Sequence, residues 1–167
     1  MRVKLLLVLL SFCFAASSVQ AQSARIGVYR GISEYDLSGV DDAKVTAVRI
    51  GYDIGPVLGV EMGMVAADLQ LQPGDARLYL PEVQLQARLP LGRVAPYVGA
   101  GAGVSVQDGD SELFTNKTET TFSAAAGVRV DLPLRLSLGA EGRIRTIGKW
   151  FTASGAEATL GIAYRFR

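Results

Sequence analysis

Residues 94–105, VAPYVGAGAGVS, hold the clearest structural signal in the chain. From Val98 onward, apolar residues alternate with glycine or serine. Successive side chains of a β-strand point to opposite faces, so Val98, Ala100, Ala102 and Val104 would share one face, with Gly99, Gly101, Gly103 and Ser105 on the other. The pattern predicts a strand with one apolar face.

The same alternation recurs along almost the whole chain. It predicts eight strands, at 24–31, 43–53, 57–67, 79–89, 94–106, 120–131, 134–146 and 156–167. A shift of one residue in the pairing of any of these strands would move its charged side chains to the apolar face. The pattern therefore also predicts which side chains of each strand share a face.

The connections between these segments alternate between short and long. The short ones, Ile54–Pro56, Pro90–Arg93 and Leu132–Pro133, all contain proline, a turn-forming residue. The long ones lie near 32–42, 68–78, 107–119 and 147–155. Long loops at one end and short turns at the other are typical of membrane barrels. We therefore predict an all-β, eight-stranded, antiparallel up-and-down transmembrane β-barrel, with room for its loops to extend the sheet.

Alternation alone does not say which face is outside, because a soluble lipocalin-like barrel has the same period with its apolar face inward. Here the polar face mixes Gly and Ser with long Arg, Glu and Gln side chains, as a narrow eight-stranded lumen requires. Aromatic residues near the strand ends also resemble the girdles of membrane barrels. The predicted interfacial aromatics are Tyr52, Tyr164 and Phe166 at the short-turn side, Phe122 near the loop side, and Trp150 and Phe151 in the last long loop. Trp150 and Phe151 could instead be an exposed contact for a partner or for lipopolysaccharide.

The first 21 residues resemble a secretory signal peptide rather than part of the fold. Arg2 and Lys4 precede an apolar run over 5–16 that is too short to span a bilayer, and Ala21 suits cleavage before Gln22. An N-terminal membrane anchor is the alternative. The expected domains are therefore a signal peptide at 1–21 and an outer-membrane barrel at 22–167. Cys13 lies in the signal peptide, which leaves the mature chain without cysteine.

Composition argues against several classes of function. Of 17 Lys and Arg residues two lie in the signal peptide, which leaves 15 against 16 acidic residues, unlike a nucleic-acid binder. The sequence has no histidine, which removes Ser-His-Asp triads and histidine metal clusters. Asp108, Asp110 and Glu112 lack the remaining ligands of an EF-hand calcium loop, so a solvated loop is expected. We expect no enzyme activity, no catalytic residues, no cofactor and no metal.

The charges on the predicted inner face suggest a polar network that fills the lumen, because an unpaired charge away from water is costly. The candidate residues are Arg49, Glu61, Glu82, Gln84, Arg88, Arg129, Glu141, Arg143 and Arg145. If the second and third strands pair around Gly55, Arg49 and Glu61 lie directly opposite each other. A less specific interpretation is that these charges only keep water in the barrel.

Three stretches carry a resemblance to a known family. They are 95–103 (APYVGAGAG), 125–129 followed by 138–143, and the closing 161–166 (GIAYRF). Together they resemble the small outer-membrane β-barrels of Gram-negative bacteria, the OmpA-like and opacity-protein-like surface proteins. The resemblance implies that the barrel-assembly machinery binds the aromatic C-terminal strand, although here Arg167 follows the last aromatic residue.

This family includes anchors, adhesins, antigens and small-solute pores. The function that we predict is non-enzymatic: a surface-exposed barrel with a structural or adhesin-like role in the cell envelope. A narrow pore for small solutes or ions is the main alternative, and a soluble ligand carrier is a third. Expected partners are outer-membrane lipid and lipopolysaccharide, with Arg30 placed to meet lipid phosphates, and a host or surface ligand at the loops.

Overall fold

The computed structural model describes residues 23–36, 43–71, 74–108, 118–148 and 153–166. These residues form eight strands and one 3₁₀ turn. The elements are β1 (Ser23–Tyr35), β2 (Ala43–Ile54), β3 (Leu58–Leu71), β4 (Gly74–Arg88), β5 (Val94–Asp108), β6 (Thr118–Asp131), η2 (Pro133–Arg135), β7 (Leu136–Ile147) and β8 (Ala153–Phe166).

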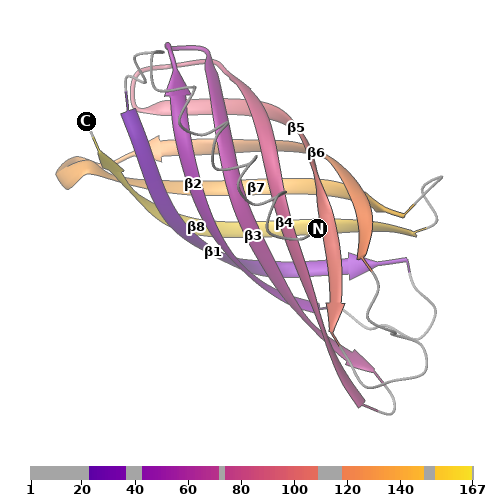
Figure 1. The fold of residues 1–167 in the computed structure, drawn as a ribbon. Coiled ribbons are helices and arrows are strands. Elements are labelled where there is room, and N and C mark those ends of the chain that lie inside the picture. The colour runs from indigo at the N-terminus through magenta and orange to yellow at the C-terminus, as the bar shows by residue number, and fades with distance from the viewer. Residues whose placement is uncertain (1–22, 37–42, 72–73, 109–117, 149–152, 167) are drawn as a thin grey trace, which may run out of the picture.

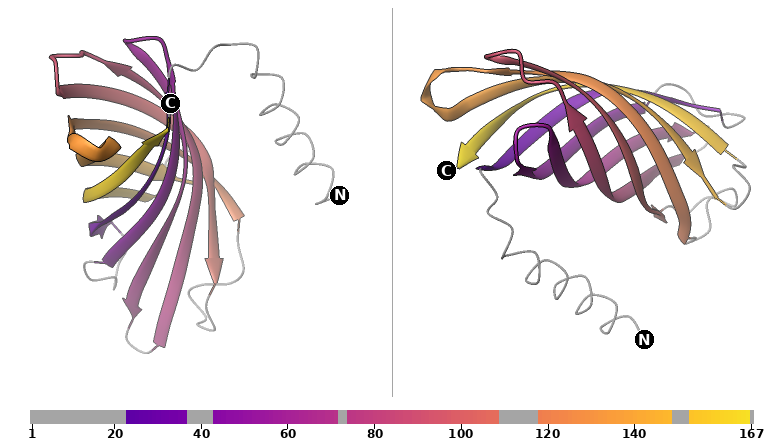
Figure 2. Two further views of the ribbon diagram at one scale, coloured as in Figure 1. Left: turned by 90° about the vertical axis from the view of Figure 1, so that its left-hand side faces the viewer. Right: turned by 90° about the horizontal axis from the view of Figure 1, so that it is seen from above.

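The strands form a closed antiparallel barrel in chain order, which confirms the predicted fold (Figures 1 and 2). Closure is made by β1 and β8, where Ala24 pairs with Phe166. The pairing can be followed from Ala24 through the partner residue on each successive strand until it has passed once around the barrel. This path of paired residues then returns to β1 at Glu34, closer to the long-loop end than Ala24. Each such path therefore climbs toward the long-loop end, as the tilted strands of a barrel require.

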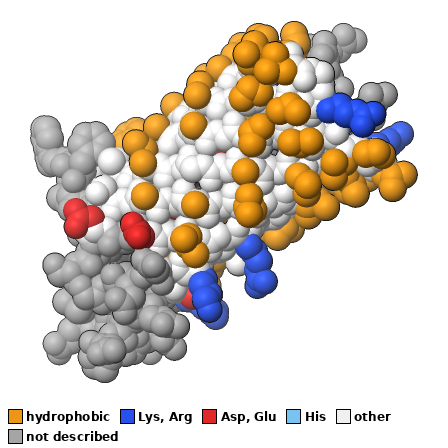
Figure 3. Space-filling model, turned by 180° about the vertical axis from the view of Figure 1, so that it is seen from behind, with side chains coloured by type: hydrophobic (Ala, Val, Ile, Leu, Met, Phe, Trp, Pro, Cys, Tyr) orange, Lys and Arg blue, Asp and Glu red, His pale blue; other side chains and the backbone are white. Residues whose placement is uncertain are grey.

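The outer surface of the wall is apolar over most of its height, and Figure 3 shows hydrophobic side chains spread across the face in view. Val28, Val48, Leu85, Val98 and Leu160 are all exposed on it. A contiguous apolar surface of this kind is unusual in a monomer dissolved in water. The barrel therefore has the apolar-out orientation, which excludes the soluble carrier with an apolar interior. No helix among the described residues is long and apolar enough to cross a membrane.

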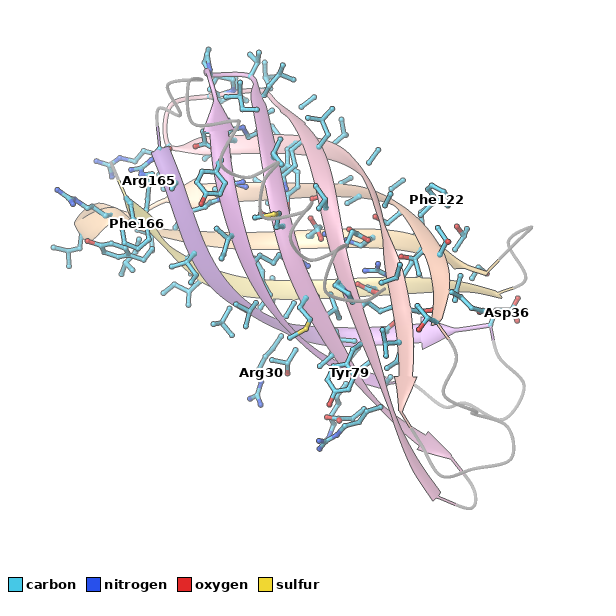
Figure 4. The ribbon with its side chains drawn as sticks, in the orientation of Figure 1. Arg30, Asp36, Tyr79, Phe122, Arg165 and Phe166 are labelled. Carbon is cyan, nitrogen blue, oxygen red and sulfur yellow. The ribbon has the colours of Figure 1, made fainter. Side chains whose placement is uncertain are left out.

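Aromatic side chains mark both edges of this apolar surface. Tyr52, Tyr164 and Phe166 are exposed at the short-turn end. The rings of Tyr164 and Phe166 pack edge to face, with 5.0 Å between their centroids. Phe122 is 52% exposed toward the opposite end (Figure 4). Trp150 and Phe151 lie outside the described residues.

The wall continues past the predicted end of the strands. The loop expected at 68–78 is wrong, because β3 runs to Leu71 and β4 begins at Gly74. Beside this extension and on the neighbouring β2, the structure describes polar side chains that point outward and apolar side chains that point inward and form a cluster. The outward set is Lys44, Thr46, Asp68 and Arg77, and the inward set includes Val45, Val65, Ala67, Leu78 and Leu80. This inverted pattern is that of a barrel wall in water, so β2–β4 rise out of the membrane.

The β6–β7 connection also differs in detail from the prediction. It is a 3₁₀ turn in which Leu134 and Arg135 adopt positive φ angles of 64° and 63°. Strand β7 therefore starts at Leu136 rather than at residue 134. The other two short turns contain Gly55 and Gly92 at φ of 74° and 68°, a conformation that favours glycine.

A closed barrel satisfies all its strand hydrogen bonds internally and should resist unfolding by SDS at room temperature. We expect the protein in the outer-membrane fraction, with a band on SDS gels that shifts in mobility only after boiling. A band with the same mobility before and after boiling would contradict the closed fold.

The inverted pattern in β2 predicts where the membrane ends. The sequence has one cysteine, Cys13, which lies outside the barrel strands, so single cysteines in the strands can be labelled in a Cys13→Ser background. In intact cells, Lys44→Cys should react with a membrane-impermeant maleimide, whereas Ile50→Cys on the same face of the same strand should be protected. Equal labelling of the two would contradict the proposed boundary.

Candidate functional site

The lumen brings together all nine residues that the sequence analysis singled out. Eight are buried on the inner face of the wall, and Arg88 is half-buried near the short-turn mouth. They come from β2, β3, β4, β6 and β7, where alternation turns every second side chain inward. The buried set is Arg49, Glu61, Glu82, Gln84, Arg129, Glu141, Arg143 and Arg145.

Two carboxylates organise the centre of the lumen. Glu82 on β4 accepts hydrogen bonds from both Arg143 and Arg145 on β7, one to each carboxylate oxygen. Glu141 binds Arg143 at 2.8 Å and Arg49 at 2.9 Å, and it accepts a 2.8 Å hydrogen bond from the Tyr97 hydroxyl. Charges of opposite sign therefore alternate across the lumen, joining β2, β4 and β7.

The predicted register of Arg49 and Glu61 is wrong by two residues. Arg49 pairs with Gly63, and Glu61 pairs with Gly51, because the turn centres on Pro56 rather than on Gly55. The two side chains are diagonal neighbours, with Arg49 Nη1 3.7 Å from Glu61 Oε1. The closer partner of Arg49 is Glu141 on the opposite wall.

A second group closes the lumen toward the short turns. Asp53 binds both Arg25 and Arg88 and accepts a 2.7 Å hydrogen bond from the Ser23 hydroxyl. Arg25 also donates to Gln86 at 3.0 Å, and its Nη2 lies 3.4 Å from Glu61. Glu61 therefore links this group to the central one.

The sequence analysis missed several members of the network, and five of them make its main contacts. These five are Arg25 on β1, Asp53 on β2, Gln86 on β4, Tyr97 on β5 and Glu157 on β8. Glu157 binds Arg145 at 2.9 Å and extends the network toward the loops. All five lie on the inward face of a predicted strand. The signal was available, since each continues the alternation of its own strand.

Arg129 is held differently from the other lumen arginines that were predicted. It forms no salt bridge with any described residue. Its guanidinium donates to Gln86 at 3.3 Å and lies 5.5 Å from the centre of the Tyr97 ring. A second such contact joins Arg49 to the Tyr29 ring at 4.4 Å. Aromatic faces therefore supply part of the compensation for buried positive charge.

Glycines on the facing strands make room for these long side chains. A Cβ at Gly101 would lie 2.7 Å from Glu82 Oε1, and one at Gly161 would lie 2.3 Å from the Tyr29 ring. A cavity of about 10 Å³ remains between Arg49, Glu61, Glu82 and Arg143, which is room for about one water molecule. The centre of the lumen is therefore packed with side chains.

Ion pairing of the lumen carboxylates with arginines limits the chemistry that this site can perform. Each of the carboxylates Asp53, Glu61, Glu82, Glu141 and Glu157 is bound by at least one arginine. The described residues contain no group of three or more potential metal ligands of the Asp, Glu, His or Cys type. The side chains of Asp108, Asp110 and Glu112 lie outside the described residues.

The family of the chain follows from its sequence together with this architecture. The model of the outer membrane protein beta-barrel domain matches residues 5–166. The chain belongs to this family. Its location is therefore the cell outer membrane, and its surroundings are outer-membrane lipid and lipopolysaccharide.

Several solved structures share the fold. Neisserial surface protein A superposes with a TM-score of 0.71 at 18% identity, covering 86% of this chain and 96% of its own. OprG from Pseudomonas aeruginosa has a TM-score of 0.63 at 15% identity, and the match covers 87% of this chain and 96% of OprG. Ail from Yersinia pestis has a TM-score of 0.59 at 16% identity, and the match covers 86% of this chain and 98% of Ail. No curated protein sequence matches the chain.

The role of Glu82 can be tested with a substitution that keeps its shape. Glu82→Gln removes the negative charge that Arg143 and Arg145 share, and breaking a buried ion pair costs about 3–5 kcal/mol. We expect a loss of that order in the free energy of unfolding, measured by urea titration in lipid vesicles. Asp68→Asn is the matched control, because its salt bridge to Arg77 is exposed to water, and it should leave stability unchanged. Equal effects of the two substitutions would contradict the proposed importance of the lumen network.

Proposed function

We propose that the protein is a non-enzymatic, non-conducting barrel that holds its extracellular loops in place for structural or adhesive contacts. The observation that carries this proposal is the continuous ion-pair network across the lumen. From Asp53 it runs through Arg25 and Glu61 into the central group and on to Glu157. A packed, charge-paired interior makes a rigid support and leaves little space for a solute.

The loop end is the natural place for specificity, because loops vary on a rigid scaffold. The chain segments between β1 and β2, β5 and β6, and β7 and β8 all connect strands at that end. One structural relative, Ail, has been crystallised in complex with the heparin analogue sucrose octasulfate. That complex supports an extracellular ligand for a barrel of this shape, and Trp150 and Phe151 are candidates for such contacts here.

Delivery to the outer membrane forms part of the proposal. Residues 1–21 would act as a cleaved signal peptide, leaving the barrel domain at 22–167. The last strand would then be bound by the barrel-assembly machinery. In support, Tyr164 and Phe166 both point outward from β8, where they are available to a partner before the barrel closes.

A narrow pore is the second candidate, and Arg129 is the residue that favours it. A lumen guanidinium without a carboxylate partner could attract a small anion. Transport would still require the central ion pairs to separate, and separating buried charges is costly.

Conductance in a planar bilayer separates these two functions. We expect the wild-type protein to be silent and a Glu82→Ala/Arg143→Ala double variant, with its central plug removed, to pass current. The double variant shows that the assay can detect an open barrel of this size. Steady wild-type current that Arg129→Gln abolishes would contradict our proposal and support an anion pore.

A further inference from the structure

The described part of the outer wall carries a basic residue, Arg30, beside its apolar surface. Arg30 on β1 is exposed and points away from the barrel (Figure 4). Its neighbours across the strands are Leu160 on β8 and Thr46 on β2. It forms no hydrogen bond or salt bridge with any described residue. A charge on the lipid-facing side is destabilising unless it reaches the polar headgroups.

An apolar groove begins at Arg30 and runs across β8, β7 and β6. It has a volume of about 670 Å³, within the range of small-ligand sites. Its floor is a row of small side chains, in which Ala126 pairs with Gly142 and Gly142 pairs with Ala158. The larger side chains of Leu160 and Ile32, which are 69% and 57% exposed, line the groove beside these small residues.

A second cation lies close to Arg30 on the side away from the groove. Lys44 on β2 pairs with Ile32, which makes it a diagonal neighbour of Arg30, at a typical separation of about 7–8 Å between Cα atoms. Lys44 begins the polar outer face of β2 where the wall leaves the membrane. Figure 3 shows Lys and Arg side chains that protrude beside the apolar surface of the wall. The nearest carboxylate on that row is Asp68, which binds Arg77 at 3.0 Å.

We infer that this surface binds one molecule of lipopolysaccharide, with an acyl chain in the groove and a phosphate on Arg30 and Lys44. A guanidinium suits this role because it binds phosphate oxygens with two parallel hydrogen bonds. The position near the long-loop end favours the outer leaflet, where the phosphorylated lipid is lipopolysaccharide. This inference goes beyond the proposed function and does not depend on whether the lumen conducts.

The groove can be filled without disturbing the barrel. A Cβ built at Gly142 meets no atom within 4 Å, so Gly142→Leu places its side chain in the groove alone. Ala100→Leu is its matched control, because Ala100 is exposed on the outer face of β5 outside the groove. For the charge, Arg30→Gln is paired with Arg93→Gln, which removes an exposed arginine from the short turn between β4 and β5, at the other end of the barrel.

Native mass spectrometry of the detergent-purified mature protein, titrated with rough lipopolysaccharide, tests the inference. We expect Arg30→Gln to weaken binding about tenfold, the scale of a lost charge-assisted hydrogen bond. Gly142→Leu should weaken it to a similar degree, while Ala100→Leu and Arg93→Gln bind as the wild type does. Dephosphorylated lipopolysaccharide should bind to the wild-type protein as weakly as intact lipopolysaccharide binds to the Arg30→Gln variant. The heat-dependent mobility shift checks that every variant is folded.

Three results would overturn the inference. Wild-type binding by folded Arg30→Gln and Gly142→Leu would show that the surface is not the site. Phosphatidylglycerol binding as tightly as lipopolysaccharide would mean that any anionic lipid suffices. Loss of a dimer in Gly142→Leu, with lipopolysaccharide binding intact, would assign the groove to a second copy of the chain.

Discussion

The structure depends on one electrostatic constraint: charges inside a narrow closed wall must find their partners inside it. Water cannot reach them freely, and an uncompensated buried charge is costly. The central lumen meets this constraint by alternating signs from wall to wall, with Glu82 and Glu141 each shared by two arginines. Because these pairs join strands far apart in the chain, they also fix how the two sides of the barrel sit relative to each other.

Alternation with a period of two predicted much of this arrangement. It assigned Glu82, Glu141, Arg143 and Arg145 to the same interior without any structural information, because facing in a strand depends only on position. It did not predict which charge meets which. Partners such as Arg49 and Glu141 lie across the lumen, and their meeting depends on barrel closure, which local sequence does not encode.

Two local errors have physical explanations. The register of β2 and β3 depended on the geometry of a turn, and a turn centred one residue further along moves every pair by two. The segment 68–78 was expected to be a loop, but it lies in the part of the wall where the apolar residues with described side chains, such as Ala67 and Leu78, face inward, opposite to the rest of the wall. That inversion follows from the solvent outside, which changes from lipid to water along the same strand. Predicting it requires knowing where the membrane ends.

The extension of β3 and β4 also gives the outer rim an uneven height, visible in Figure 1 where these strands project beyond the others. Among the described residues, β3 and β4 make the taller side, and the inward side chains at this height form an apolar cluster with residues of β1, β2 and β7. A large molecule that approached along the cell surface from that side would meet a hydrogen-bonded sheet in water before it reached the membrane-embedded wall. The barrel is therefore asymmetric with respect to its neighbours in the membrane.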